Sequence, residues 1–301
     1  MALLNFRREA VSSSQTPPTN GVLPAFLDGF SIEVMPRTAA KIEDFRALLP
    51  EGTRVYVAHI EGTPIEEMVA TVKRLREDGF EPMPHFPARI MRDALELREW
   101  VARYKGEAGV KQALLLGGGP KTPLGSLDNS MQLLESGAFA GFERIHFAGH
   151  PEGNRDIDVS GGDKIVMEAL KLKQKFADTT DADCAIVTQF AFEAGPMIAW
   201  VDRLAAEGIK MPVHIGIAGP GKLQTLLKFA ISCGVGPSLK VLQKRAKDVT
   251  KLLAPIEPTE LLKDLAKHKA AHPEFGIEAV HFFPLGGIKT NATWIAEQMK
   301  G

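Results

Sequence analysis

Glu33 is the residue whose type and position point most directly to chemistry. It stands in the apolar run Ile32-Glu33-Val34-Met35, where a carboxylate is costly unless it has partners or a task. Removal from water raises the pKa of a glutamate above its usual value of about 4.3, towards the range in which a carboxyl group donates a proton near neutral pH. Glu33 is therefore either a general acid or a carboxylate that turns away from the site to pair with a lysine or arginine.

Three histidines and two glycine-rich turns also follow apolar runs. His59, His85 and His150 occupy places where metal ligands could stand, but no HxH or HExxH pair accompanies them. No metal site is therefore predicted, and contacts to a cofactor or a place in the core are better interpretations. The glycine-rich turns at 117–119 and 219–221 would let backbone amides approach a phosphate, a carbonyl or a flat ring.

A polar face is expected on the helix predicted over 163–178. Glu168, Lys171, Gln174 and Lys175 lie there at positions i, i+3, i+6 and i+7, so they share one side of the helix. From the residues alone, a solvated helix face is the better interpretation, and a cofactor-binding face is the alternative.

The elements that must position these residues follow one repeating pattern. A short apolar run is followed by a turn and then by an amphipathic stretch such as 65–78. Eight such runs alternating with helices are typical of a single parallel β/α barrel of the TIM type, whose active site lies at the carboxyl ends of the strands. The predicted strands are Ser31–Met35, Arg54–His59, Glu81–Phe86, Gln112–Leu116, Arg144–Ala148, Cys184–Phe190, Pro212–Ile217 and Ala279–Leu285. Other helices are predicted near 37–48, 88–105, 127–137, 195–207, 221–233, 238–252, 258–271 and 290–300, so extra helices are expected between strands seven and eight.

A doubly wound open sheet is the rival architecture. It needs fewer strands and a GxGxxG turn after its first strand, where this chain has Pro36-Arg37-Thr38. Residues 1–24 are rich in Ser, Thr, Pro, Asn and Gly and are predicted to form a flexible N-terminal tail. The barrel is predicted to take up 25–301 as one catalytic domain.

Composition argues against several classes of function. The 301 residues carry 36 Lys and Arg against 37 Asp and Glu, a net charge of -1, so no nucleic-acid partner is expected. Cys184 and Cys233 lie in apolar runs without metal-ligand spacing, which argues against a disulfide scaffold and a structural zinc site. No stretch has the about 20 apolar residues of a membrane span, and no secretory leader is recognised. A reduced, cytoplasmic location is expected.

Four segments together resemble methylenetetrahydrofolate reductase. They are Ser31-Ile32-Glu33-Val34-Met35-Pro36-Arg37-Thr38, Pro84-His85, Gly149-His150-Pro151-Glu152-Gly153 and Ile186-Val187-Thr188-Gln189-Phe190-Ala191-Phe192. The similarity covers nearly the whole chain after the tail. It implies a β/α barrel that binds FAD, reduces it with NADH or NADPH, and passes the hydride to 5,10-methylenetetrahydrofolate to give 5-methyltetrahydrofolate. Flavin and folate would then carry the organic chemistry.

The resemblance also implies roles for individual residues. Glu33 matches the catalytic glutamate that helps to protonate the folate, so that its five-membered ring opens. Gln189 matches a glutamine that contacts the substrate, and an amide can both donate to and accept from a pterin edge. Phe229 matches an aromatic residue that packs against folate or nicotinamide. The positions implied to contact the cofactor are Ala58, His85, Leu116, Gly117, Gly118, His150, Asn154, Glu168, Lys171, Gln174 and Lys175.

The chain departs from the family pattern after strand four. Gly117-Gly118-Gly119 stands where the family has Arg-Gly-Asp. The missing carboxylate would make an anionic reduced flavin easier to form and would remove a hydrogen-bond partner of the pterin. His150 and Asn154 stand within a segment that usually reads Tyr-Pro-Glu-Gly-His, and Ala58 replaces a common threonine.

Two other functions stay open at this stage. One is a barrel that binds folate or a related pterin and acts in methyl transfer without flavin, which the missing carboxylate after strand four would explain. The other is a binding barrel without catalytic activity. The choice between NADH and NADPH is left open because no dinucleotide fingerprint is present, and the resemblance makes self-association into a homo-oligomer an expectation.

Overall fold

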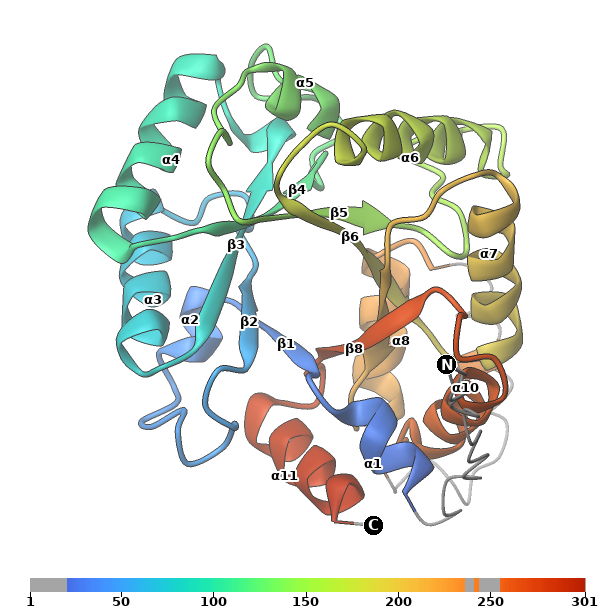
Figure 1. The fold of residues 1–301 in the computed structure, drawn as a ribbon. Helices are drawn as coiled ribbons and strands as arrows, with labels where there is room; N and C mark the ends of the chain where they lie inside the picture. The colour runs from blue at the N-terminus through green and yellow to red at the C-terminus, as the bar shows by residue number, and fades with distance from the viewer. Residues whose placement is uncertain (1–20, 236–240, 244–254, 301) are drawn as a thin grey trace, which may run out of the picture.

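Eight parallel strands close into a barrel in the computed structural model, in the order β1 to β8 with β8 returning to β1 (Figure 1). The structure describes residues 21–235, 241–243 and 255–300. The predicted TIM-type barrel is therefore confirmed, and every predicted strand is present within two residues at its start. The strands are β1 Ser31–Val34, β2 Arg54–Val57, β3 Glu81–Pro87, β4 Gln112–Leu116, β5 Arg144–Gly149, β6 Asp183–Ala191, β7 Val213–Ala218 and β8 Ile277–Phe283.

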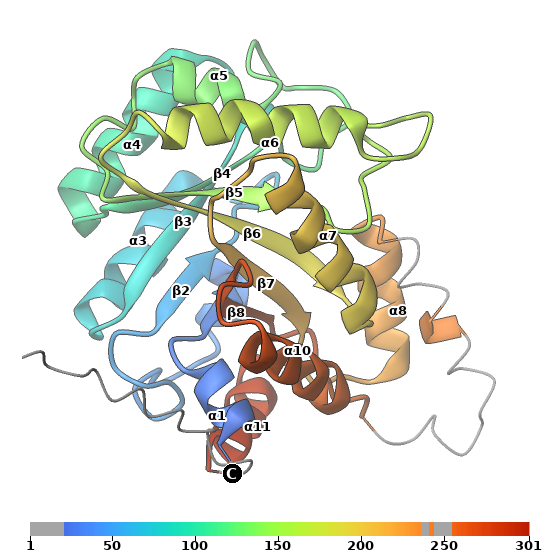
Figure 2. The ribbon, with the colours of Figure 1, turned by 45° about the vertical axis from the view of Figure 1, so that its right-hand side comes forward.

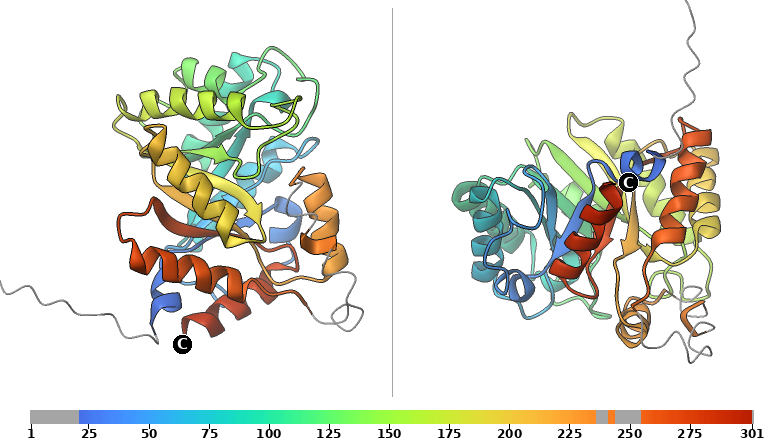
Figure 3. Two further views of the ribbon diagram at one scale, coloured as in Figure 1. Left: turned by 90° about the vertical axis from the view of Figure 1, so that its right-hand side faces the viewer. Right: turned by 90° about the horizontal axis from the view of Figure 1, so that it is seen from below.

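Helices surround the barrel and contact their neighbours (Figure 2). In the view from below, α1 lies beside α11 near the C-terminal end of the chain (Figure 3). The α-helices are α1 Val22–Leu27, α2 Pro36–Ala39, α3 Ile65–Glu77, α4 Ala94–Ala108, α5 Ser130–Glu135, α6 Lys164–Ala177, α7 Ala194–Ala206, α8 Leu223–Ser232, α10 Thr259–Ala271 and α11 Ile288–Met299, and a 3-10 helix, η1, covers Ala88–Ile90. The extra helices expected between the last two strands are confirmed by α8 and α10. Of the helix predicted at 238–252, only 241–243 lie within the described residues, and these are helical.

The helix predicted over 37–48 is wrong beyond its first turn. The helix α2 ends at Ala39, and turns and bends follow to residue 50. Asp44 accepts hydrogen bonds from both the backbone N–H and the Nε of Arg46, a local arrangement that competes with helix formation. Arg74 of α3 donates to the carbonyl oxygens of Ala39, Ile42 and Glu43, all three of which a helix continuing to residue 48 would have used itself.

Two other helices differ from expectation. The helix α1, which packs against α10, α11 and β8, was not predicted from the sequence. The helix predicted to begin at 88 begins instead at Ala94, because the carboxylate of Asp93 accepts from the backbone N–H groups of Leu95 and Glu96 and so caps that end.

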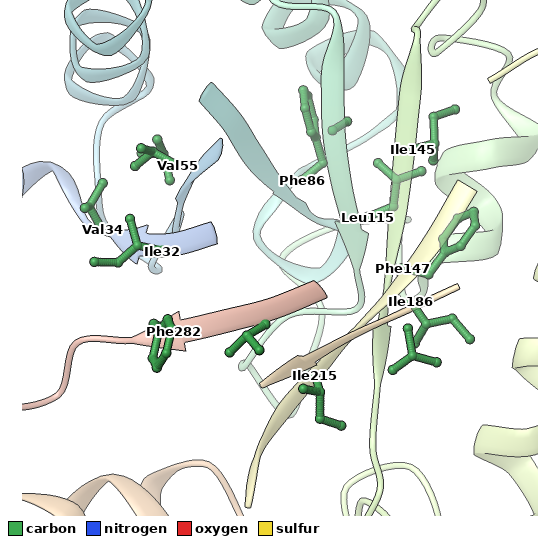
Figure 4. Packing of buried hydrophobic residues seen from close by; sticks show 14 of the residues in the cluster. Ile32, Val34, Val55, Phe86, Leu115, Ile145, Phe147, Ile186, Ile215 and Phe282 are labelled. Atoms are coloured by element: carbon green, nitrogen blue, oxygen red, sulfur yellow. The ribbon is translucent and has the colours of Figure 1, made fainter. Parts of the chain in front are cut away.

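A large apolar layer lies between the strands and the helices (Figure 4). Alternate side chains of each strand face outward into it, as Ile32 and Val34 do on β1 and Val55 on β2, all nearly or fully buried. Each such side chain contributes about 1.5–3 kcal/mol through removal from water. The side chains between them face the barrel axis.

The barrel interior is unusually polar. Tyr56, Met83, Leu114 and Val187 form a small apolar cluster there, whereas barrels of this type are usually filled with layers of Val, Ile and Leu. Further interior positions carry hydroxyl and imidazole groups with at most 2% of their surface exposed. These residues are Ser31, His146, His214 and His281.

None of the helices in the described part of the chain has the length and apolar character of a membrane span.

Candidate functional site

A carboxyl group lies between two imidazoles at the mouth of the barrel. Glu33 Oε2 of β1 is 3.4 Å from His85 Nε2 of β3 and 3.9 Å from His281 Nε2 of β8. The Glu33 side chain is 22% exposed, whereas His85 is 9% and His281 is 0% exposed. Neither imidazole Nε2 has a hydrogen-bond partner. Glu33 therefore lies among side chains from three strands at the mouth, and within the described part of the chain it forms no ion pair with a lysine or arginine.

Burial favours the uncharged form of each of these side chains. It raises the pKa of Glu33, and the nearby His85 opposes that rise only in part. Burial also lowers the pKa of His85 to about 4 against the opposing effect of Glu33, and that of His281 to about 3. Glu33 is thus favoured as an uncharged carboxylic acid beside uncharged imidazoles, which is the state in which a general acid can donate its proton.

A raised Glu33 pKa predicts a pH-dependent stability. A carboxyl group whose pKa is raised on folding contributes its full stability below its unfolded pKa and loses it as pH rises through the folded pKa. Glu33→Gln is therefore expected to raise the melting temperature relative to the wild type at pH 8 and to lose this advantage near pH 4. Circular dichroism melts at several pH values test this. The exposed Glu274→Gln serves as the control, and a pH-independent difference for Glu33→Gln would contradict the assignment.

Gln189 reaches the same mouth through a bulge in β6. Val187 pairs with His214 but Phe190 pairs with Gly216, so β6 carries one extra residue opposite β7. The side-chain Nε2 of Gln189 donates to the carbonyl oxygen of Cys233 at 3.2 Å. This contact joins β6 to the end of α8.

The end of α8 lies close to Glu33. Cys233 caps this helix, and burial raises the pKa of its thiol to about 11, with a smaller effect of the nearby Glu33 carboxyl in its ionised form. The hydrogen bond from Gln189 therefore connects the end of α8 to the barrel mouth. Sequence reasoning did not identify Cys233 or His281 as site residues. The sequence contained one signal for His281. Alternation along β8 places His281 and Phe283 on the inward face, and His281 pairs in register with Ser31 of β1.

Gly216 makes room for the bulge. A Cβ at Gly216 would lie 2.2 Å from the carbonyl oxygen of Thr188 and 2.8 Å from the carbonyl carbon of Gln189. Gly216→Ala is therefore expected to lower the free energy of unfolding by about 1–3 kcal/mol and to weaken ligand binding at Gln189. Urea unfolding measures the first effect. Gly195→Ala, at a helix position with open space around it, should be neutral, and equal effects of the two variants would contradict the steric argument.

Phe229 lies on α8 in an apolar group beside the mouth. It is half-buried and packs against a cluster that includes Phe190, Leu226 and Ala230. A cavity of about 410 Å³ adjoins this cluster. Its lining residues are Phe192, Ala218, Leu223, Leu226, Pro255, Ile256, Glu257, Pro258, Glu260 and Leu261. The contact of Phe229 with folate or nicotinamide stays a prediction.

His150 and Asn154 follow β5. The Nδ1 of His150 has no hydrogen-bond partner, and burial lowers its pKa to about 4, with the Gln189 side chain acting in the opposite direction. This places His150 beside Gln189 with a free polar atom. Asn154 instead organises its own loop, since its Oδ1 accepts from the backbone N–H of Asp156.

The predicted cofactor contacts on β2 and β4 lie around the mouth. Ala58 is buried and its backbone N–H donates to Val34, while the adjacent His59 turns outward, stacks on Trp100 with ring centroids 4.6 Å apart and contacts the carbonyl oxygen of Thr63. Among the described residues no group of three or more His, Cys, Asp or Glu side chains is arranged to hold a metal ion.

Of the three glycines after β4, Gly118 is required by the local backbone. Gly117 accepts a hydrogen bond from the backbone N–H of Arg89, and Leu116 is half-buried against the interior cluster. Gly118 has φ +102°, and a Cβ there would lie 3.1 Å from Pro87 Cβ. These positions let the loop pass close to the end of β3, where they would present backbone to a ligand.

The four predicted contacts on α6 are not brought to the mouth together. Lys171 forms ion pairs with Glu168 and with Glu207 at the end of α7. Gln174 Oε1 accepts from the backbone N–H groups of Lys210 and Met211, which precede β7 and so lie at the amino end of the barrel. Lys175 lies in the last turn of the same helix. FAD contacts by these residues stay a prediction.

Comparison with known proteins identifies the fold. No protein-family model matches the sequence. An uncharacterized protein from Clostridium thermocellum, which binds two copies of 5-methyl-5,6,7,8-tetrahydrofolic acid, has a similar structure with a TM-score of 0.56 and 12% sequence identity, over 92% of this chain and 96% of that chain. The carboxyl transferase domain of Rhizobium etli pyruvate carboxylase has a TM-score of 0.48 at 11% identity, over 90% of this chain and 43% of that chain. An intracellular xylanase from Thermoanaerobacterium saccharolyticum has a TM-score of 0.43 at 14% identity, over 90% of each chain. The first likeness supports a β/α barrel and, at this identity, no finer assignment.

Proposed function

We propose that this protein interconverts 5,10-methylenetetrahydrofolate and 5-methyltetrahydrofolate with Glu33 as the general acid. The observation that carries the proposal is the position of the largely buried Glu33 carboxyl at the barrel mouth, between His85 and His281, where burial raises its pKa. The folate-binding barrel from Clostridium thermocellum supports the substrate class, since it shares the fold along nearly the whole chain.

Reduction of the methylene bridge requires a proton and a hydride. Glu33 donates the proton to the folate nitrogen, so that the five-membered ring opens to an iminium that accepts hydride. Burial raises its pKa, which favours the acid form that donates the proton. Gln189 presents an amide that donates to and accepts from the pterin edge, and the half-buried Phe229 and its cluster offer an apolar surface to the remainder of the substrate.

NADH or NADPH supplies the hydride, and FAD is the proposed carrier. A bound FAD would supply hydride transfer between the nicotinamide and the folate. The residues at the mouth fit such a group, because the buried His85 Nε2 and His150 Nδ1 lack partners and Gly117 and Gly118 present backbone without side chains. The α6 residues Lys171 and Gln174 do not add to this fit, since both are bonded to protein at the other end of the barrel.

A second candidate is folate chemistry without flavin. It is favoured by the engagement of Lys171 and Gln174 in protein contacts and by the absence of a carboxylate at 117–119. Such a barrel would take the hydride directly from the nicotinamide or act in methyl transfer. A cytoplasmic location and a homo-oligomeric state also stay proposals.

The visible spectrum of the purified protein tests the flavin proposal. We expect a yellow protein whose absorption is bleached anaerobically by NADH or NADPH and restored by methylenetetrahydrofolate. A colourless protein that cannot be reconstituted with FAD, but still binds 5-methyltetrahydrofolate, would support the flavin-free candidate. A protein that binds neither folate nor FAD would overturn both.

A further inference from the structure

A column of side chains that can transfer protons runs through the barrel interior. Buried polar groups cost free energy unless they are hydrogen-bonded, and they replace the aliphatic layers that usually stabilise such barrels. The column begins at the mouth and ends at the amino ends of the strands. Its members are Glu33, His281, Ser31, Tyr56, His146, His214 and Glu278.

The upper part of the column joins Glu33 to His281. His281 Nε2 is 3.9 Å from Glu33 Oε2 and has no hydrogen-bond partner. On its other side, His281 Nδ1 shares a hydrogen bond of 2.9 Å with Ser31 Oγ. An imidazole held in this way can take a proton on one nitrogen and release one from the other.

Tyr56 forms the middle of the column. Its ring meets the ring of His281 edge to face, with centroids 4.5 Å apart. Its hydroxyl shares a 2.6 Å hydrogen bond with His146 Nδ1. Burial raises the pKa of Tyr56, so the hydroxyl stays uncharged and takes part only by accepting one proton while giving another.

The lower part of the column reaches solvent. The rings of His146 and His214 meet with centroids 4.8 Å apart. His214 Nε2 is 2.8 Å from Glu278 Oε2, and His214 Nδ1 has no partner. The Glu278 side chain is 60% exposed, and Glu278 is the second residue of β8, so it lies at the end of the barrel opposite the mouth.

The charges around the column keep its imidazoles neutral. Burial lowers the pKa of His146, His214 and His281, and the arginines Arg54 and Arg144 lower the pKa of His146 and His214 further, while Arg54 also acts on His281. Glu278 opposes this at His214 through its hydrogen bond. The imidazoles of the column are therefore favoured in their neutral form, and a proton that reaches one of them is favoured to pass to a neighbouring group.

We propose that this column returns a proton to Glu33 after each turnover, a role that rests on the proposed function. Glu33 gives its proton to the folate while the bound ligands cover the mouth. A proton then enters from solvent at the Glu278 carboxylate, and each imidazole or hydroxyl accepts one proton and releases another until Glu33 Oε2 regains its own. Three steps of this route lack a hydrogen bond: His214 to His146, Tyr56 to His281, and His281 to Glu33. Rotation of the His214 and His281 rings makes these three transfers. One proton moves in total, and no electron does.

Tyr56→Phe and Glu278→Gln test the column in the full-length protein. The first turnover should keep its wild-type rate, because Glu33 begins protonated. The steady-state rate should fall by about tenfold or more, with a larger solvent deuterium isotope effect. Glu143→Gln is the matched control, since Glu143 lies just before β5 at the same end and pairs with Lys111 outside the column. It should change neither rate.

Two results would overturn the proposal. Equal loss in the first turnover and in the steady state would show a structural role, and an unchanged steady-state rate in both variants would show that the proton arrives through the mouth. If the wild type forms no methylfolate, the proposed function fails and the column is tested separately by ¹⁵N NMR of its imidazoles. Glu278→Gln should then shift the tautomer populations of His146 and His281, which it does not contact, and unchanged spectra would overturn the column.

Discussion

Glu33→Gln is expected to lower the rate of folate reduction by about 10²- to 10⁴-fold, the range that a positioned general acid contributes. Glutamine keeps the shape of the side chain and its contacts with His85 and His281 but has no acidic proton. Reduction of the bound carrier by NADH or NADPH needs no proton from Glu33 and should stay close to the wild-type rate. Stopped-flow absorbance of the two half-reactions measures both.

Comparing the two half-reactions distinguishes a catalytic role of Glu33 from a structural one. A structural role for Glu33 would slow both half-reactions together. Glu33→Asp is a useful companion, because it retains the acid but withdraws it from the mouth by one methylene, and it should recover part of the lost rate. A Glu33→Gln variant with normal folate reduction would remove Glu33 from the mechanism.

Gln189→Leu is expected to lower kcat/KM for the folate by about 10- to 100-fold, since leaving polar groups unpaired in a buried site costs about 1–3 kcal/mol. Two contacts are lost together in this variant. The pterin edge loses its amide partner, and the carbonyl oxygen of Cys233 loses the hydrogen bond that holds the end of α8 over the mouth.

Cys233→Ala is the control, because it changes the residue that Gln189 contacts but removes neither contact. The hydrogen bond from Gln189 goes to the backbone of Cys233, so removal of the thiol leaves it intact. This variant should stay within about twofold of the wild type, as is usual for a change that removes no hydrogen bond. If Gln189→Leu binds and reduces folate normally, neither contact of the amide contributes to the reaction.

The strands could be predicted from the sequence because each carries a short apolar run that is buried on its outer face. Ile32 and Val34 face the helices while Glu33 between them faces inward, and the same alternation separates the inward Ala58 from His59, which stacks on Trp100. Alternation also places His281 on the inward face of β8, but its position beside β1 follows only once β8 is paired with β1.

Contacts between distant segments could not be predicted in the same way. The segment after α2 has an adequate helical pattern, yet Arg74 from α3 binds its carbonyl oxygens and the helix stops at Ala39. The bulge that aims Gln189 depends on the missing side chain of Gly216 on another strand. On α6, helical spacing placed Lys171 and Gln174 on a shared face, but it could not show that this face is bonded to α7 and to the start of β7.

We propose above that this barrel reduces methylenetetrahydrofolate with the proton of Glu33. Its most direct test is mass spectrometry of the folates formed when the purified protein, with FAD, is incubated anaerobically with methylenetetrahydrofolate and NADH or NADPH. We predict 5-methyltetrahydrofolate in amounts well above one equivalent of protein, and almost none with Glu33→Gln. A folded wild type that binds the folate but yields no 5-methyltetrahydrofolate, with or without FAD, would contradict the account.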